Sequence, residues 1–124
     1  MLDQVKSGLP KLVVWMGDSL AVVRAFPQEV REEVGYALYQ AQTGEKHESV
    51  KPVKGFGPGV LEVVSDHRSG TYRAVYTVRL AGKVYVLHAF QKKSKRGIAT
   101  PKSELELIRP RLKRALELHA SQED

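Results

Sequence analysis

Residues 71–105 decide the fold, and they read TYRAVYTVRLAGKVYVLHAFQKKSKRGIATPKSEL. In residues 72–78 the even positions carry the tyrosines and the odd positions include Arg73. Alternate side chains of a strand point to opposite faces, so this pattern predicts a strand with two unlike faces. The segment 79–83 contains one glycine and predicts a tight turn. The apolar run 84–90 predicts a second strand that is covered on both sides. Strands joined so closely pair antiparallel, because a parallel return needs a crossover of about a dozen residues.

The rest of the chain predicts an α+β fold. The expected elements are, in chain order, a strand at 12–15, a helix at 19–26, a helix that Pro27 opens, a connecting loop at 47–59, strands at about 60–65, 71–79 and 83–91, and a helix that Thr100 caps and Pro101 opens. This order gives an N-terminal strand and helical hairpin, a three-stranded antiparallel meander and a C-terminal helix. Pro110 predicts a bend in the last helix, because a proline inside a helix costs about 3 kcal/mol. The tail after Leu118 is expected to fray.

Length and composition favour one soluble domain. A chain of 124 residues is long enough for one hydrophobic core, which we expect over about 12–118. The absence of cysteine excludes a disulfide framework and a thiolate metal site, and it suits the cytoplasm. The sequence has no apolar run of membrane-spanning length, and its first residues lack the apolar core of a signal peptide. We therefore expect a cytoplasmic protein with no membrane partner.

The positive charge is concentrated in one segment. The chain carries a net charge of +6, whereas residues 83–114 hold ten basic and two acidic residues and carry +8 by themselves. Such a field attracts polyanions, of which a nucleic acid is favoured, although a solvated helix face that binds nothing is the alternative. The candidate RNA-binding cations outside the catalytic set are Lys54, Lys95, Arg96 and Lys102.

Conventional cofactor chemistry has no signature in the sequence. The four histidines have no metal-ligand spacing, so we expect no metal site and no cofactor. His88 lies in an apolar strand, where a histidine is more often a hydrogen-bonded core residue. The glycines between 55 and 59 precede a strand and not a helix, which argues against a phosphate-binding loop. No serine or cysteine nucleophile motif is present.

The remaining chemistry is that of cations on a phosphodiester. RNA carries its own nucleophile, the 2′-hydroxyl group, so an enzyme that aligns it and stabilises the transition-state charge needs no metal. Arg73 is the best candidate for a phosphate clamp, because a guanidinium group presents a planar fork of donors. Lys92 and Lys93 add charge at the end of the last strand. The strand tyrosines Tyr72, Tyr76 and Tyr85 could stack on bases, but a core role is favoured.

Several short motifs resemble one protein family. They are Trp15-Met16-Gly17-Asp18-Ser19, Gly59-Val60-Leu61-Glu62-Val63, Tyr72-Arg73-Ala74-Val75-Tyr76 and, above all, Leu87-His88-Ala89-Phe90-Gln91-Lys92-Lys93-Ser94 through Thr100-Pro101. As a set they are similar to the RelE/ParE toxin superfamily of bacterial type II toxin–antitoxin modules, and to its HigB-like, phage-derived branch in particular. The similarity extends over about residues 13–115.

The resemblance implies metal-independent, ribosome-dependent cleavage of mRNA and inhibition of translation. It also implies neutralisation by a helix-turn-helix antitoxin. By position, Arg73 matches the strand arginine that contacts the scissile phosphate, and Lys93, with Lys92 beside it, matches the basic residue at the end of the last strand. Two departures concern Glu62 and Val64, which lie where relatives can carry basic residues, and a late tyrosine that has no counterpart here. The general acid or base is therefore open among Lys54, His67, His88 and Lys93.

Two other activities remain open at this point. A ParE-like inhibitor of DNA gyrase would leave message intact and block supercoiling. A catalytically silent module would bind RNA or a partner in a salt-dependent way without cleaving it. One fold can host all three activities, so the fold cannot separate them.

Overall fold

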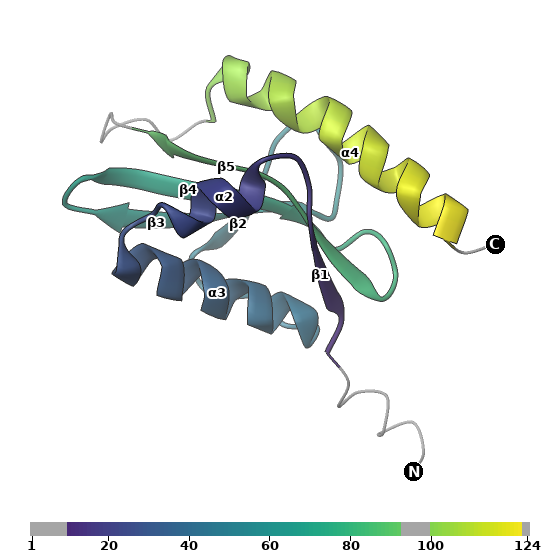
Figure 1. Cartoon of the computed structure of the whole chain (residues 1–124), viewed down its shortest axis with the longest axis horizontal. Helices are drawn as coiled ribbons and strands as arrows, with labels where there is room; N and C mark the ends of the chain where they lie inside the picture. The colour runs from purple at the N-terminus through teal and green to yellow at the C-terminus, as the bar shows by residue number, and fades with distance from the viewer. Residues whose placement is uncertain (1–9, 93–99, 123–124) are drawn as a thin grey trace, which may run out of the picture.

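The computed structural model describes residues 10–92 and 100–122. Its elements are β1 (Leu12–Trp15), α2 (Ser19–Arg24), α3 (Gln28–Gln42), β2 (Val50–Pro52), β3 (Val60–His67), β4 (Gly70–Thr77), β5 (Lys83–Lys92) and α4 (Lys102–Gln122). Helices α2 and α3 lie on one side of a central sheet and α4 lies on the other (Figure 1). The α+β architecture expected from the sequence is confirmed.

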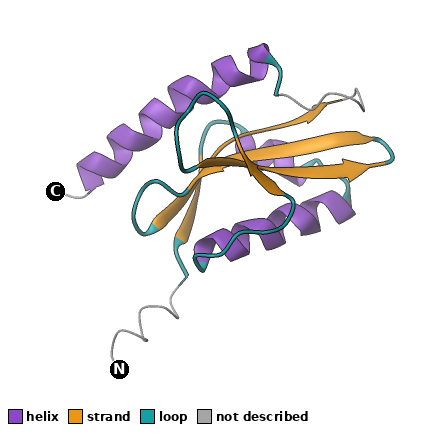
Figure 2. Cartoon of the chain, turned by 180° about the vertical axis from the view of Figure 1, so that it is seen from behind, coloured by secondary structure: helices purple, strands orange, loops and turns teal. Residues whose placement is uncertain are grey.

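The sheet has five strands in the order β1-β5-β4-β3-β2. Strands β3, β4 and β5 form the expected antiparallel meander, while β1 pairs with β5 in parallel. The fifth strand, β2, lies within residues 47–59, which were expected to form only a loop, so that prediction was wrong for Val50–Pro52. It pairs antiparallel with β3 at the sheet edge, where Pro52 is tolerated because an edge strand has a side without ladder hydrogen bonds. Figure 2 shows the same sheet from behind.

Alternation along β4 divides the core into two layers. Tyr72, Ala74 and Tyr76 pack on the side of α3, in a cluster with Val34 of that helix. Val75 packs on the side of α4. Tyr72, Tyr76 and Tyr85 are all buried, so their core role is confirmed. We call the two sides of the sheet the α3 face and the α4 face.

The helices follow the expected signals, and the last one extends further than expected. The apolar stripe of α3 is buried as expected: Val30, Val34, Leu38 and Ala41. Helix α4 continues through Pro110, which is exposed together with Glu106, so the carbonyl group that the proline leaves without a helical donor lies on the solvent side. The end of α4 was expected to fray after Leu118, whereas the helix extends to Gln122. Within the described residues, no helix is both long and apolar enough to cross a membrane.

Candidate functional site

Strand register gathers charged side chains on the α4 face. Lys51 of β2 lies directly opposite Glu62 of β3. Arg73 of β4 lies opposite Val64, two residues along β3 from Glu62, so Glu62 and Arg73 are diagonal neighbours on the same face. Diagonal neighbours on a sheet lie within reach of long side chains. A lysine, a glutamate and an arginine from three consecutive strands therefore meet at one place.

Arg73 and Glu62 form a buried ion pair. Nη1 of Arg73 donates to Oε2 of Glu62 at 3.1 Å, and the two side chains are 2% and 3% exposed. The hydroxyl group of Thr100, just before α4, donates to Oε1 of Glu62 at 3.0 Å, and Nη1 of Arg73 lies 3.4 Å from the same hydroxyl oxygen. Both oxygens of the carboxylate are thus engaged. The arginine expected from the sequence to contact a phosphate is held by a glutamate of its own chain.

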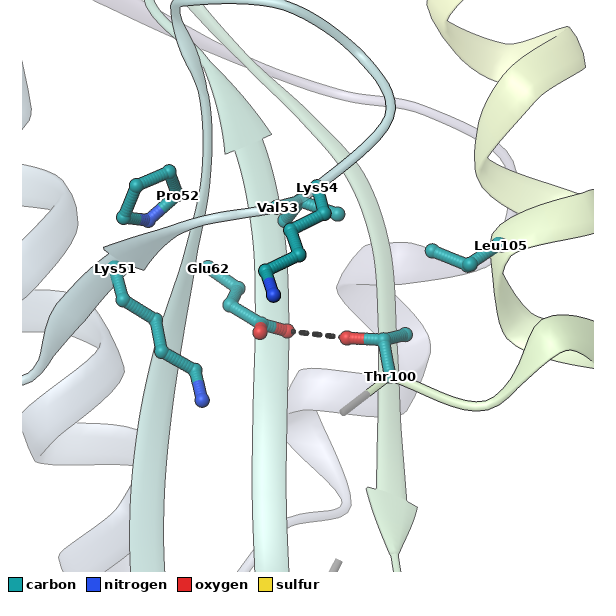
Figure 3. A pocket seen from close by; sticks show the side chains of 7 residues that line it. All are labelled: Lys51, Pro52, Val53, Lys54, Glu62, Thr100 and Leu105. Carbon is teal, nitrogen blue, oxygen red and sulfur yellow. Dashed lines mark hydrogen bonds between the residues drawn. The ribbon is translucent and has the colours of Figure 1, made fainter. Parts of the chain in front are cut away.

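A pocket opens beside this pair. It has a volume of about 320 Å³ and is lined by Lys51, Pro52, Val53, Lys54, Glu62, Thr100 and Leu105. Figure 3 shows the ammonium group of Lys54 pointing toward the carboxylate of Glu62, with the side chain of Lys51 extending alongside. Arg73 does not line the pocket itself, but it bonds to Glu62, which does. Two lysines and one carboxylate line the pocket, and the guanidinium group bonded to that carboxylate is a third cation, which suits the site to an anionic ligand.

Only some of the other cations predicted for the site lie within the described residues. Lys92 lies opposite Thr71 in the sheet and is partly exposed, so its side chain shares the α4 face with Arg73. Lys102 is the first residue of α4 and is exposed, and it lies in the sequence between the pocket residues Thr100 and Leu105. Lys93, Lys95 and Arg96 lie outside the described residues. The structure therefore brings Lys54, Arg73 and Lys92 to one face.

His67 lies on the opposite side of the sheet from Arg73. It lies two residues from Ser65 on β3 and so shares its face of the sheet, and the hydroxyl group of Ser65 donates to Glu33 of α3. Its Nε2 lies 3.1 Å from Oε1 of Glu29, and its Nδ1 accepts the backbone N–H of Ser69 at 3.2 Å. The fold does not bring His67 to the pocket.

His88 is on the α4 face, but it is buried in a separate network. Its Nε2 lies 2.6 Å from Oε1 of Glu104, and Nη1 of Arg111 lies 3.0 Å from its Nδ1. Arg111 also donates to the carbonyl of Leu87 and pairs with Asp18 at 3.1 Å. A Cβ atom at Gly17 would lie 2.6 Å from Cζ of Arg111, so the glycine makes room for this guanidinium group. The network fastens α4 to β5 and to the start of α2.

Three residues of the pocket were not singled out from the sequence as functional. Glu62 was noted only as a departure from the family pattern, Lys51 was assigned to a loop, and Thr100 was read as a helix cap. One signal in the sequence could have pointed to Glu62. It lies two residues from Val64, the cross-strand partner of Arg73, and residues two apart on a strand share a face of the sheet. Using it required the register between the strands, which a single sequence does not give.

Two further observations limit the chemistry of the described part of the chain. Residues 10–92 and 100–122 contain no group of three or more histidine, aspartate or glutamate side chains that could hold a metal ion. On the α3 face, burial raises the pKa of Tyr76 to about 12, so its hydroxyl group stays protonated at neutral pH.

Comparison with known proteins gives one family and one fold. The sequence pattern of the family described as phage derived protein Gp49-like (DUF891) matches residues 21–113. No curated protein matches the chain. A structure of the E. coli toxin RelE, a double arginine-to-alanine mutant in the free state, is similar with a TM-score of 0.57 and 19% identity, over 84% of this chain and 99% of that chain. The toxin–antitoxin complex RelBE2 from Mycobacterium tuberculosis has a TM-score of 0.45 and 17% identity, over 70% of this chain and 97% of that chain. The RelE-like fold expected from the sequence is confirmed.

Proposed function

This chain belongs to the Gp49-like family of phage-derived proteins, and from this premise we propose that it is the toxin of a bacterial toxin–antitoxin module. Its activity is the metal-independent cleavage of mRNA on the ribosome, which stops translation in the cytoplasm. Its partner is a small helix-turn-helix antitoxin that neutralises it. The RelE-like fold supports this assignment.

The observation that carries the proposal is the pocket on the α4 face. Arg73, Lys51 and Lys54 supply positive charge beside a cavity of about 320 Å³. Cleavage of RNA by its own 2′-hydroxyl group builds negative charge on the phosphate oxygens, and fixed cations stabilise that charge. A guanidinium group is well suited to two of those oxygens at once. The pocket therefore offers what a metal-independent ribonuclease requires.

Glu62 is the proton acceptor in this mechanism. When Arg73 turns to the scissile phosphate, the carboxylate of Glu62 is released within the pocket and takes the proton of the 2′-hydroxyl group. The 2′-oxygen then bonds to phosphorus while the bond from phosphorus to the 5′-oxygen breaks. The ammonium group of Lys54 gives its proton to the departing 5′-oxygen. The products are a 2′,3′-cyclic phosphate and a 5′-hydroxyl end.

The ion pair itself favours a second candidate function. Since Arg73 is already neutralised by Glu62, a chain in which this pair never opens would keep its surface lysines and bind RNA without cutting it. Such a binding module would show salt-dependent RNA affinity and no change in message length. The two candidates differ in one measurable product, the cleaved RNA end.

Expression in a bacterial host separates these candidates. For the toxin, expression arrests growth, and primer extension on cellular mRNA finds new ends that depend on translation of the message. Arg73→Ala abolishes both effects. Arg114→Ala, which removes an exposed arginine of α4 that pairs only with its helical neighbour Glu117 in the described structure, keeps both.

Circular dichroism of the purified variants has to show that Arg73→Ala is folded. Growth arrest with intact message would refute the nuclease, and blocked supercoiling in the same cells would assign the arrest to gyrase. RNA binding with neither arrest nor cleavage would establish the binding module. Co-expression with the product of the adjacent reading frame then tests neutralisation.

A further inference from the structure

The carboxylate of Glu62 lies where an anionic ligand would bind. Arg73 contacts one of its oxygens at 3.1 Å and the hydroxyl group of Thr100 contacts the other at 3.0 Å. Lys51 lies directly across from it on β2, and the ammonium group of Lys54 points toward it (Figure 3). A carboxylate that is surrounded in this way uses the same donors that a phosphate group would use.

We propose that Arg73, Thr100, Lys51 and Lys54 form a phosphate-binding site whose place is filled, in the absence of ligand, by the carboxylate of Glu62. The ligand class is a phosphate group, either free or within a nucleic-acid backbone. The existence of this site does not depend on the proposed function. Only the identity of its biological ligand, an RNA phosphodiester, rests on that function.

Charge and space both support the exchange of one anion for another. Two lysines line the pocket beside a carboxylate that pairs with Arg73, so cations outnumber carboxylates among these residues. The pocket volume of about 320 Å³ leaves room for a phosphate group. The displaced carboxylate stays inside the pocket, since Glu62 is one of its lining residues.

The resident carboxylate sets the affinity of the site. A phosphate group binds only the fraction of molecules in which Glu62 has left Arg73, so the observed dissociation constant is the intrinsic one divided by that fraction. Removing the carboxylate removes this competition. We expect Glu62→Ala to bind phosphate at least about tenfold more tightly than the wild type, which is the gain that corresponds to an open form of about one tenth or less in the wild type.

The chain provides a matched control on the other side of the sheet. Glu33 of α3 accepts hydrogen bonds from the hydroxyl groups of Ser49 at 2.7 Å and Ser65 at 2.5 Å, on the α3 face. Glu33→Ala removes the same atoms and the same charge as Glu62→Ala. It therefore corrects for the general gain in phosphate affinity that any loss of negative charge produces.

The experiment measures phosphate binding to the full chain at constant ionic strength. Inorganic phosphate and a 2′-deoxy oligonucleotide, which cannot be cleaved, are titrated by calorimetry into the wild type, Glu62→Ala and Glu33→Ala. The expected result is an affinity gain of about tenfold or more for Glu62→Ala alone. The gain disappears in Glu62→Ala/Arg73→Gln. A gain for both probes identifies a site for any phosphate, and a gain for the oligonucleotide alone identifies a site for the nucleic-acid backbone.

Two results would overturn the proposal. One is equal phosphate affinity in Glu62→Ala and Glu33→Ala, and the other is a gain that survives the loss of Arg73. If Glu62→Ala does not fold without ligand, Glu62→Asp takes its place. That variant keeps the charge but withdraws the carboxylate from Arg73 by one methylene group, and it is expected to show an intermediate gain. Failure of the proposed function is separate, because it would appear as absent RNA cleavage by a wild-type chain whose variants still show the gain.

Discussion

The two faces of the sheet each hold a glutamate that is hydrogen-bonded within the fold, buried at Glu62 and half-buried at Glu33, in opposite surroundings. On the α3 face, Glu33 is bonded to two serine hydroxyl groups beside an apolar, aromatic core. On the α4 face, Glu62 is bonded to a buried arginine beside an open pocket with two lysines. The neutral partners of Glu33 indicate a carboxylate with a structural role. The cationic partner of Glu62 and the adjacent cavity indicate a carboxylate that another anion can replace.

The largest expected effect is on RNA cleavage. Glu62→Gln removes the proton acceptor without changing the shape of the side chain, so we expect the cleavage rate to fall by about 10²- to 10⁴-fold. Glu33→Gln makes the same change on the α3 face and should retain the wild-type rate. The measurement is single-turnover cleavage of message on programmed ribosomes. A wild-type rate in Glu62→Gln would remove Glu62 from the mechanism.

The next largest effect is on folding stability. Glu62→Ala leaves Arg73 as a buried charge without its carboxylate, which costs about 3–5 kcal/mol. Glu33→Ala leaves two neutral hydroxyl groups without their acceptor and no buried charge, and it should cost about 1–2 kcal/mol. Urea unfolding of the two variants measures the difference. Equal losses would mean that the two faces hold their glutamates in the same way.

Tyr76 makes the α3 face sensitive to alkaline pH. Burial raises the pKa of Tyr76 to about 12, above its ordinary value of 10.0, so the stability linked to its protonated form is complete below pH 10 and is lost as pH rises through about 12. The loss is about 2–3 kcal/mol. Tyr76→Phe should show a smaller loss over this pH range, as measured by urea unfolding. The variant should also match or exceed wild-type stability at pH 7, because within the described residues the buried hydroxyl group has no hydrogen-bond partner. An unchanged alkaline loss would contradict this assignment.

The smallest effect concerns an exposed cation at the pocket. Lys54→Met should weaken binding of a 2′-deoxy oligonucleotide only a few-fold and reduce the slope of log affinity against log salt by about one. The matched control is Lys113→Met, an exposed lysine of α4 that does not line the pocket. If both variants lower the slope equally, nucleic acid binds along α4 as well as at the pocket.

Local patterns were sufficient to predict most of the fold. Period-two alternation placed β4, apolar runs placed β3 and β5, and the apolar stripe of α3 identified its buried side, because these signals depend on neighbouring residues in the chain. Strand β2 was missed since a three-residue edge strand between prolines and glycines is held by its partner β3 and has little pattern of its own. Helix α4 passes through Pro110 because packing of its apolar side against the sheet offsets the local preference.

The candidate site was predictable only in part. Composition and parity pointed to Arg73 and Lys92, which the fold does bring to one face. The partner of Arg73 depends on the register between β3 and β4, and the role of Lys51 depends on β2, so neither followed from one sequence. His67 was a candidate by residue type alone, and the face of the sheet on which it lies separates it from the pocket.

The most direct test of this account is to map where a phosphodiester binds. Amide chemical shifts of the wild-type chain are recorded during titration with a 2′-deoxy oligonucleotide. The account predicts that shifts concentrate at Lys51, Lys54, Glu62, Arg73 and Thr100, while α3 and its face of the sheet stay unchanged. Shifts confined to α3 and the residues around Glu33, in a chain that still cleaves RNA, would contradict it.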